Sequence, residues 1–393
     1  MDSLILVVNP GSSSRKYALF DNGTLKINAH YEQAASGSHV TLVSGDSENK
    51  HSINEQVFAN ALEDFLRTCE QDHDIRRDTI TAAGVRLVAP GRLFLEHKIL
   101  DTNLHEHIKQ IVDRAPLHIA VELDQISQIQ DTLPDLPICL ISDSAFHRTL
   151  SHEARNYAIP REDAEAHDIY RFGYHGISVK SVVHVLREEL NLDYPRLIVC
   201  HLGSGASITA IRNWQSIDTT MGYSPLEGLI MATRSGTIDV EAALEIKKQL
   251  NFSDEQLKDY LNNQSGLLGL SGSSNDIRKL LELEERGDES AKFALDAMVY
   301  RVQSFIGAYY AVLGGLDGIV FTATVGERSA ILRRRICESI AHLGLELDTF
   351  KNDGVDSTTA TISRDSSKVA IHVIPSNEVA EIARQTVHTL ANK

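Results

Sequence analysis

The N-terminal part of the chain alternates between short apolar runs and polar turns. The run Leu4–Val8 predicts a buried strand, and extended character resumes over Lys16–Phe20 before a turn at Asp21-Asn22-Gly23. The polar stretch 34–52 predicts surface strands and loops. Apolar residues then recur at helical spacing between Val57 and Leu66, which predicts a helix.

The same alternation continues toward the C-terminus. Ile138–Ser142 and Gly318–Thr322 are apolar runs that predict buried strands. Val182–Leu190 and Phe293–Leu313 carry helical stripes, and the second stripe stops at Gly314-Gly315. Strands that alternate with helices in this way predict an α/β architecture.

The segment Leu197–Ala210 repeats the N-terminal pattern of apolar strand, Gly-Ser corner and apolar strand. Gly11-Ser12 and Gly203-Ser204 occupy the same place in the two copies, so we expect two related domains that face a shared cleft. Glycine lets a ligand approach the backbone, while serine hydroxyls and backbone N–H groups donate to anionic oxygens. The paired corners therefore predict phosphate binding, whereas one corner alone is equally well read as a solvated hairpin.

Neither corner has the residue pattern of a P-loop or of a dinucleotide-binding turn. Lys16 lies two residues beyond Ser14, so both side chains are expected on one face of the second strand, where Lys16 would reach a phosphate. The alternative role of such a lysine is to protect a strand edge from aggregation.

Composition and charge exclude some classes of partner. The chain has 393 residues, 42% of them hydrophobic, and a formal net charge of −16, which argues against nucleic acid and anionic membranes as partners. The densest cationic run, Arg333-Arg334-Arg335, is expected to be a solvated helix face. Four widely spaced cysteines suggest neither a zinc module nor a disulfide framework, and no leader or membrane-spanning stretch is evident, so we expect a cytoplasmic protein.

Several motifs together resemble one known family. Asn9–Lys16 and Gly222–Gly236 are similar to the two signatures of the acetate kinases, which belong to the superfamily of actin, the sugar kinases and the heat-shock ATPases. The resemblance continues, in the order of the family, through Ala115–His118, Asp143–His147, Gly173–Gly176, Ser271–Arg278 and Ile374–Glu378.

The resemblance implies two related actin-like, ribonuclease H-like domains around a nucleotide cleft. Residues 1–147 would form the N-terminal domain, completed by the C-terminal helix at 380–393, and residues 148–379 the nucleotide-binding domain. It also implies a homodimer and reversible, Mg²⁺-dependent, in-line phosphoryl transfer from ATP to acetate, giving acetyl phosphate and ADP, with Mn²⁺ as a substitute metal.

Alternative functions follow from the same residues. They are a propionate kinase, a pyrophosphate-dependent acetate kinase, and a non-catalytic nucleotide-binding module on the same fold. Arg86 and Arg234 argue against the last, because a conformational ATPase has no need of two arginines directed at a carboxylate. A metal hydrolase is disfavoured because the chain has no HExxH pattern.

By this resemblance, four residues carry the catalysis. Arg86 and Arg234 would clamp the acetate carboxylate or the migrating phosphoryl group, because a planar guanidinium donates two parallel hydrogen bonds. His175 would stabilise the transition state, and Asp143, at the end of an apolar strand, would orient the metal or the arginines. No general base is needed, since acetate is already ionised near neutral pH.

The resemblance also implies the binding residues. Asn9 and Glu378 would hold the magnesium ion. The alternative role of Glu378 is that of a carboxylate stabilised by the dipole at the start of the final helix, which Asn377 would cap. The acetate methyl pocket would be lined by Val88, Leu117, Tyr174 and Pro225. The nucleotide would be bound by Ser12, Lys16, His201, Leu202, Gly203, Ser204, Gly205, Asp276, Ile277, Arg278, Thr324, Val325, Gly326, Glu327 and Arg328.

The chain departs from the usual family pattern at particular places. On the nucleotide side, Ser204, Thr324, Arg328 and Ala232 replace Asn, Gly, Asn and Gly, so the identity of the phosphoryl donor is open. On the acetate side the departures are Val85, Ala89-Pro90, Ile119 and Tyr174, the last of which is expected to place a hydroxyl near the acyl pocket. The sequence leaves the choice between acetate and propionate, the direction of flux and regulation undecided.

Overall fold

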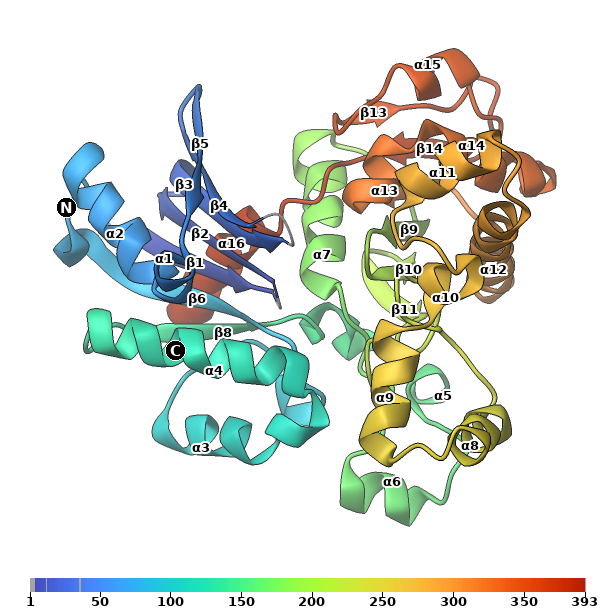
Figure 1. Ribbon diagram of the computed structural model, residues 1–393. Helices are drawn as coiled ribbons and strands as arrows, with labels where there is room; N and C mark the ends of the chain where they lie inside the picture. Colours follow the sequence, from blue (N-terminus) through green and yellow to red (C-terminus); the bar gives the residue numbers. More distant parts are fainter. Residues whose placement is uncertain (1–3, 12, 35–36, 393) are drawn as a thin grey trace. The chain divides into compact units, whose positions relative to one another are not determined.

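The computed structural model describes residues 4–11, 13–34 and 37–392. It divides the chain into two compact units, Met1–Ala145 with Asn377–Lys393 and Phe146–Ser376. Each unit is built around one mixed sheet (Figure 1).

The first unit has an eight-stranded sheet in the order β5-β4-β3-β2-β1-β6-β8-β7. Its strands are β1 Leu4–Pro10, β2 Ser14–Asp21, β3 Thr24–Ala34, β4 Gly37–Ser44, β5 Ser47–Ile53, β6 Ile80–Leu87, β7 Lys98–Ile99 and β8 Ile138–Ser142. Its α-helices are α1 Glu55–Ala59, α2 Ala61–Asp72, α3 Thr102–Gln110, α4 Pro116–Thr132 and α16 Glu378–Ala391. The strands β1, β6 and β8 run parallel, so their carboxyl ends share one edge of the sheet.

The second unit has a six-stranded sheet in the order β11-β10-β9-β12-β14-β13. Its strands are β9 Arg196–Leu202, β10 Ala206–Arg212, β11 Gln215–Thr219, β12 Gly318–Thr322, β13 Ala360–Thr361 and β14 Ala370–Val373. Its α-helices are α5 His152–Arg155, α6 Arg161–His167, α7 Gly176–His184, α8 Val240–Gln249, α9 Asp254–Asn263, α10 Gly266–Ser271, α11 Ile277–Glu285, α12 Glu289–Leu313, α13 Ala323–Arg328, α14 Ala330–Ser339 and α15 Thr349–Asp353.

The two sheets repeat one topology. In the first unit three antiparallel strands, β3-β2-β1, are followed by the parallel strands β6 and β8. In the second unit β11-β10-β9 are followed in the same way by β12 and β14. The expectation of two related α/β domains is thereby confirmed at the level of strand order and direction, although the second unit begins with the helices α5, α6 and α7 and not with its hairpin β9–β10.

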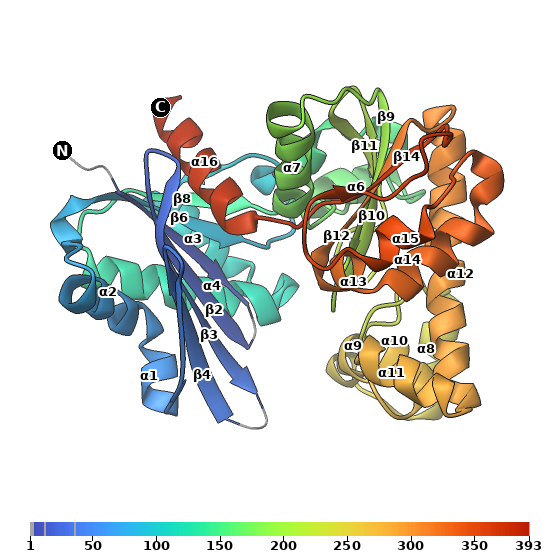
Figure 2. The ribbon, with the colours of Figure 1, turned by 90° about the horizontal axis from the view of Figure 1, so that it is seen from above.

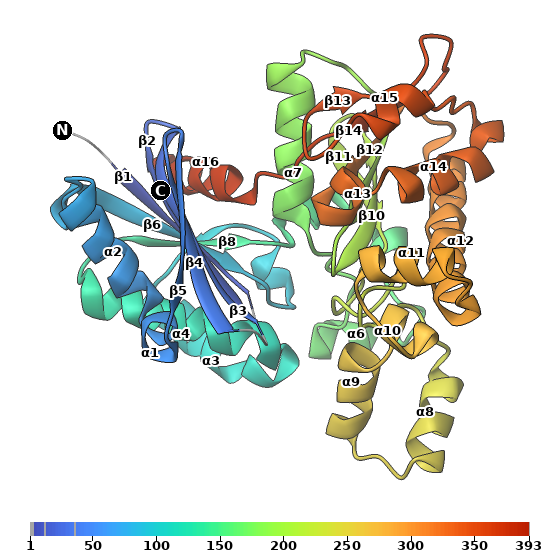
Figure 3. The same ribbon diagram turned by 45° about the horizontal axis from the view of Figure 1, so that its top comes forward.

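Helices cover both faces of each sheet. In the first unit α4 packs on β1 and β6, while α16 packs on β1, β2, β6 and β8. In the second unit α7 and α12 lie on opposite faces of the sheet (Figure 2). The helices α8 and α9 of that unit lie beyond the sheet (Figure 3). Within the described residues, no helix combines the length and the apolar character that crossing a membrane requires.

Most predicted elements are present, with local corrections. The helical stripe from Val57 to Leu66 is two helices separated at Asn60, and the stripe from Val182 is completed by a π-helical turn at Val185–Glu189. The expectation of a solvated face is wrong for Arg333, whose side chain is 1% exposed. Its guanidinium donates to the carbonyl oxygens of Gly326 and Glu327, at 3.0 and 2.7 Å, which explains why it is buried.

Candidate active site

In the first unit, two charged side chains meet where parallel strands end. Arg86 is the penultimate residue of β6, and Asp143 directly follows β8. The Asp143 N–H donates to the Leu87 carbonyl at 2.9 Å, and Arg86 Nη2 donates to Asp143 Oδ2 at 3.0 Å. Ligand sites of α/β sheets lie at the carboxyl ends of strands, so this pair stands where the sequence places catalytic residues.

The surroundings of Arg86 keep it charged. Burial by itself lowers the pKa of Arg86, but the carboxylates of Asp143 and Glu378 outweigh it, so the pKa is raised above its usual range. The Asp143 side chain is 1% exposed, and the ion pair with Arg86 stabilises its charge in this buried position. The guanidinium has more donors than this one bond uses, which suits it to binding an anion.

Asn9 and Glu378 also lie together. Asn9 is buried near the end of β1, and its Nδ2 donates to Glu378 Oε2 at 2.9 Å. Glu378 begins α16, whose N-cap Asn377 accepts from the Ala380 N–H, as predicted. Mg²⁺ prefers hard oxygen ligands and keeps several waters, so the amide oxygen of Asn9 and the carboxylate of Glu378 are ligand types that fit such an ion. Among the described residues, no group of three or more His, Cys, Asp or Glu side chains could hold a metal ion alone.

Lys16 shares this end of the sheet. It is paired directly with Asn9 across β1 and β2, so the two side chains lie on one face. Lys16 and Asn377 line one cavity of about 320 Å³ beside the start of α16. Ser12 lies outside the described residues, and the corner around it is closed by a 2.8 Å hydrogen bond from the Gly11 N–H to the Ser14 carbonyl.

Val88 is buried immediately after β6, and its N–H donates to the carboxylate of Glu122 at 2.7 Å. Leu117 belongs to α4, but its side chain lies outside the described part of the structure. Of the two acyl-pocket side chains predicted in this unit, the structure therefore describes that of Val88.

In the second unit, two imidazoles stack. His175 precedes α7 with a φ of 60°, and its ring lies 4.0 Å from that of His201, inclined by 20°. His175 Nδ1 is 3.0 Å from Ser207 Oγ, and His201 Nδ1 is 2.7 Å from Ser178 Oγ. These serines fix both ring planes, which orients the Nε2 atoms.

Arg234 approaches the same place. A Cβ atom on Gly205 would lie 3.3 Å from His175 Nε2 and 3.6 Å from Arg234 Nη1. Gly205 thus lets both side chains reach the backbone of the Gly-Ser corner, where a larger residue would press on them. The structure brings His175, His201 and Arg234 together around residues 203–205.

Two further acyl-pocket candidates lie near these residues in the chain. Arg234 Nη1 is 3.4 Å from the Pro225 carbonyl oxygen. Tyr174 is buried, and its hydroxyl donates to the Tyr223 carbonyl at 2.7 Å. The hydroxyl that replaces the usual Phe edge thus has a hydrogen-bond acceptor within the protein, and its nearness to the acyl pocket stays a prediction.

Two of the three predicted nucleotide segments are neighbours. The corner after β9 is closed by a 3.0 Å hydrogen bond from the Gly203 N–H to the Gly205 carbonyl. The segment Thr324–Arg328 lies in α13, which follows β12, and a Cβ on Gly203 would lie 3.5 Å from the Ala323 Cβ. The departures Ser204, Thr324 and Arg328 are all exposed, and Arg328 Nε donates to Ser357 at 2.9 Å.

The third segment, Asp276–Arg278, begins α11, which packs on α12. Asp276 is the N-cap: its Oδ1 accepts from the Arg278 N–H at 2.9 Å, and its Oδ2 pairs with the Arg278 guanidinium at 2.7 Å. This carboxylate has a clear structural role, and its contact with adenosine stays a prediction.

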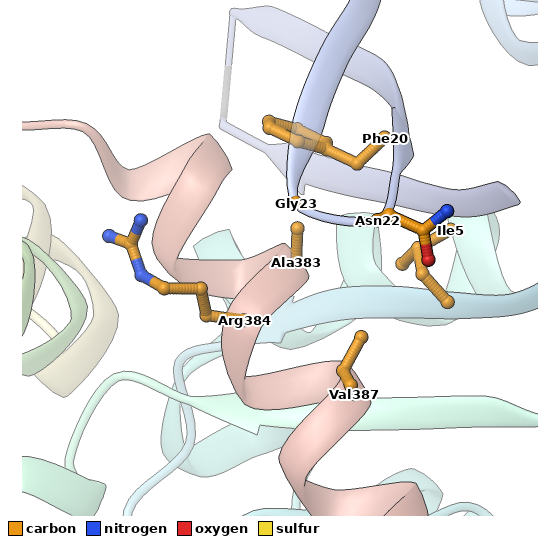
Figure 4. A pocket seen from close by; sticks show the side chains of 7 residues that line it. All are labelled: Ile5, Phe20, Asn22, Gly23, Ala383, Arg384 and Val387. Atoms are coloured by element: carbon orange, nitrogen blue, oxygen red, sulfur yellow. The ribbon is translucent and has the colours of Figure 1, made fainter.

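A separate cavity of about 310 Å³ lies between α16 and the turn after β2 (Figure 4). Apolar side chains line it together with Arg384, which pairs with Glu381 at 2.8 Å. None of the sequence-predicted site residues lines this cavity, so we leave it out of the candidate site.

Comparison with known proteins decides the family. The sequence profile of the acetokinase family matches residues 4–384. The chain belongs to the acetokinase family. It is 40% identical to an acetate kinase of Dictyoglomus thermophilum, over 99% of this chain and all of that protein, and 37% identical to one of Acetivibrio thermocellus, over 99% of both.

Solved structures of similar proteins agree with the assignment of the chain to the acetokinase family. Acetate kinase of Porphyromonas gingivalis superposes with a TM-score of 0.87 at 31% identity, over 99% of this chain and 100% of that one. A propionate kinase of Francisella tularensis subsp. tularensis superposes with the same score at 35% identity, over 98% of both chains. The likeness extends over both compact units.

The structure also adds residues to this acetokinase site that the sequence reasoning missed. Glu122 contacts Val88, and Ser207 and Ser178 orient the two stacked histidines. The sequence does contain a glutamate within the apolar stripe of a helix and serines next to apolar strand positions. A polar residue at such a position needs a hydrogen-bond partner, but the sequence does not identify that partner.

Proposed function

We propose that this acetokinase reversibly transfers the γ-phosphoryl group of ATP to acetate, giving acetyl phosphate and ADP. The observation that carries the proposal is the position and charge of Arg86. Its guanidinium lies at the carboxyl end of β6, donates a hydrogen bond to Asp143 and is kept charged. A planar cation held in this way is suited to a small carboxylate or to a transferring phosphoryl group.

In the proposed step an acetate oxygen attacks the γ-phosphorus in line. The bond from that phosphorus to the bridging oxygen of ADP breaks, and its electron pair leaves with ADP. No proton has to move, because acetate is ionised near neutral pH. Catalysis is therefore mainly positioning and stabilisation of charge on the equatorial oxygens.

The protein groups have separate tasks in this proposal. Arg86 and Arg234 donate hydrogen bonds to the transferring phosphoryl group. His175, which is oriented by Ser207, donates a hydrogen bond to the same group. Lys16 and the N–H groups of residues 203–205 bind nucleotide phosphates. Asn9 and Glu378 would hold Mg²⁺, and the bound ion would offset the charge of the nucleotide phosphates.

A propionate kinase is a second candidate. A structurally similar protein of 35% identity carries that name. The extra CH₂ of propionate changes binding by only about 0.8 kcal/mol, roughly fourfold, so a small apolar pocket discriminates weakly. We expect propionate to be accepted as a substrate beside acetate.

The decisive experiment traps acyl phosphate with hydroxylamine. Acetate, propionate and butyrate are each combined with ATP, GTP or pyrophosphate, with and without Mg²⁺. We expect the largest hydroxamate yield with acetate, ATP and Mg²⁺, and loss of product when EDTA removes the metal. Product with pyrophosphate alone would overturn the choice of donor, and no product in any combination would favour a non-catalytic nucleotide-binding module.

We also propose that the protein works in the cytoplasm as a homodimer. Light scattering after size exclusion measures the oligomeric state, and a monomer at working concentration would contradict it.

A further inference from the structure

Helix α4 carries one acidic residue within its buried stripe. Ile119, Ile126 and Ile129 are fully buried, and Glu122 lies on the same stripe with 1% exposure. Burial of a carboxyl group costs free energy unless it is neutral or paired, so Glu122 requires a specific environment.

The two oxygens of Glu122 have different surroundings. Oε1 accepts the N–H of Val88 at 2.7 Å, which joins α4 to the segment after β6. Oε2 is buried and has no hydrogen-bond partner within the described residues. Val88 is a proposed acyl-pocket residue two positions after Arg86, so this bond holds the backbone of the carboxylate-binding segment.

The charged groups around Glu122 come from β6 and from the segment after β8. Burial raises the pKa of Glu122 to about 8, against the lowering effect of the Val88 N–H and of Arg86, while Asp143 raises it further. Near neutral pH the carboxyl group holds a proton, so Glu122 adds no further negative charge to those of Asp143 and Glu378 around Arg86. Ionisation of Glu122 adds a negative charge that competes with a bound anion for Arg86.

We propose that Glu122 is a positioning residue, which fixes the Val88 backbone and, by staying uncharged, leaves the charge of Arg86 available to the carboxylate substrate. The proposal rests on the proposed function, since it assigns the affinity for acetate to a residue that acts through Val88 and Arg86.

Three variants of the full chain test it. Glu122→Leu removes the acceptor at similar volume, Glu122→Gln keeps an acceptor but cannot ionise, and Asp124→Asn removes a carboxylate from the exposed face of the same helix. The KM for acetate, the KM for ATP and kcat are measured between about pH 6 and pH 9.

We expect E122L to raise the KM for acetate about tenfold, because the Val88 N–H loses its partner, with the KM for ATP changed less than twofold. E122Q restores most of that affinity. In the natural chain the KM for acetate rises above about pH 8, and this rise is absent in E122Q and present in D124N. Equal effects on both substrates in E122L, or an alkaline rise that persists in E122Q, would overturn the proposal.

A second measurement does not depend on activity. In protein labelled with ¹⁵N-valine, the Val88 amide signal, assigned with a Val88→Ile variant, is expected to titrate near pH 8 in the natural chain and to lose this titration in E122Q. A pH-independent Val88 signal overturns the role of Glu122 even where the enzyme is active. A titrating signal in a chain that makes no acyl phosphate supports the coupling and rejects the proposed function instead.

Discussion

At the scale of single residues, the candidate site depends on ion pairs and hydrogen bonds between strand ends. The sequence predicted Arg86 from the family resemblance alone, whereas Asp143 at the end of an apolar strand and His175 between glycines also carried a local signal. It did not predict Glu122, since its partner is a backbone N–H 34 positions away, which no local pattern reveals. Contacts of this kind depend on which helix packs behind which strand.

Loss of Arg86 tests the central ion pair. We expect Arg86→Ala to lower kcat/KM by about 10²–10³-fold, because a donor to the developing charge is removed. It also removes Arg86 from a buried ion pair with Asp143, and loss of one member of such a pair costs about 3 kcal/mol or more of stability. Arg86→Lys keeps the charge but loses the planar fork, so it should recover stability better than activity.

The matched control is Arg67→Ala, which breaks an exposed pair with Asp64 on α2. Kinetics and denaturant unfolding are measured for all three variants. Full activity of R86A in a folded protein would contradict the assignment.

Ser207 offers a finer test of orientation. Its hydroxyl is buried and lies 3.0 Å from His175 Nδ1, so Ser207→Ala removes a contact that orients the imidazole. We expect kcat to fall about tenfold, the value of one net hydrogen bond, while the KM for acetate changes little. The exposed Ser339→Ala on α14 serves as control, and an unchanged kcat in S207A would reject the role of this contact.

At the scale of elements, most strands and the long helix α12 follow from periodicity and turn residues. Gly314 ends α12 with a φ of 72°, the left-handed cap that glycine favours. The break between α1 and α2 and the burial of Arg333 did not follow, because both depend on tertiary packing. Arg333 holds the carbonyl oxygens of α13, a partner that the charge run alone does not indicate.

The packing of α16 on β6 leads to a stability prediction. A Cβ on Gly84 would lie 2.0 Å from Thr386 Oγ1 and 3.0 Å from Ile382, so Gly84→Ala forces the helix away from the strand. We expect a loss of about 1–3 kcal/mol in the free energy of unfolding, partly restored by adding Thr386→Ala. Gly307→Ala in α12 meets no atom within 4 Å and should stabilise by about 0.5–1 kcal/mol. Equal unfolding midpoints for G84A and G307A would contradict this packing.

At the scale of the whole molecule, the sequence predicted two related α/β domains from the repeated corners, and the two sheets share strand order and direction. The predicted domain boundaries stay a prediction, since compactness does not establish which segments fold independently. The chemistry was predictable because it resides in short motifs. The side chains that support it were not, since they come from elements distant in sequence.

Glu122 and His372, one from each unit, should contribute to stability in opposite directions as pH changes. Glu122 has a raised pKa, about 8 against 4.5, so its contribution to stability is complete below pH 4.5 and is lost as pH rises to 8. His372 in the other unit has its pKa lowered by burial from 6.5 to about 4, so its contribution is complete above pH 6.5 and is lost as pH falls to 4.

Thermal unfolding of the natural chain, E122Q and His372→Asn between about pH 4 and pH 8 checks this. The slope of Tm against pH should become less negative on the alkaline side in E122Q and less steep on the acid side in H372N. Slopes identical to those of the natural chain would contradict the shifted pKa values of both Glu122 and His372. We compare slopes because each substitution also shifts Tm by the same amount at every pH.

Helix α16 is the last helix of the chain, yet it packs on β1, the first strand. On the ribosome, the sheet of the first unit emerges early and keeps one apolar face uncovered until residues 146–376 have also been made. At roughly 5–20 residues per second this delay lasts on the order of 10–50 s. During that time the nascent polypeptide exposes an aggregation-prone apolar surface. The yield of folded protein in the cell should therefore depend on chaperones that bind growing chains.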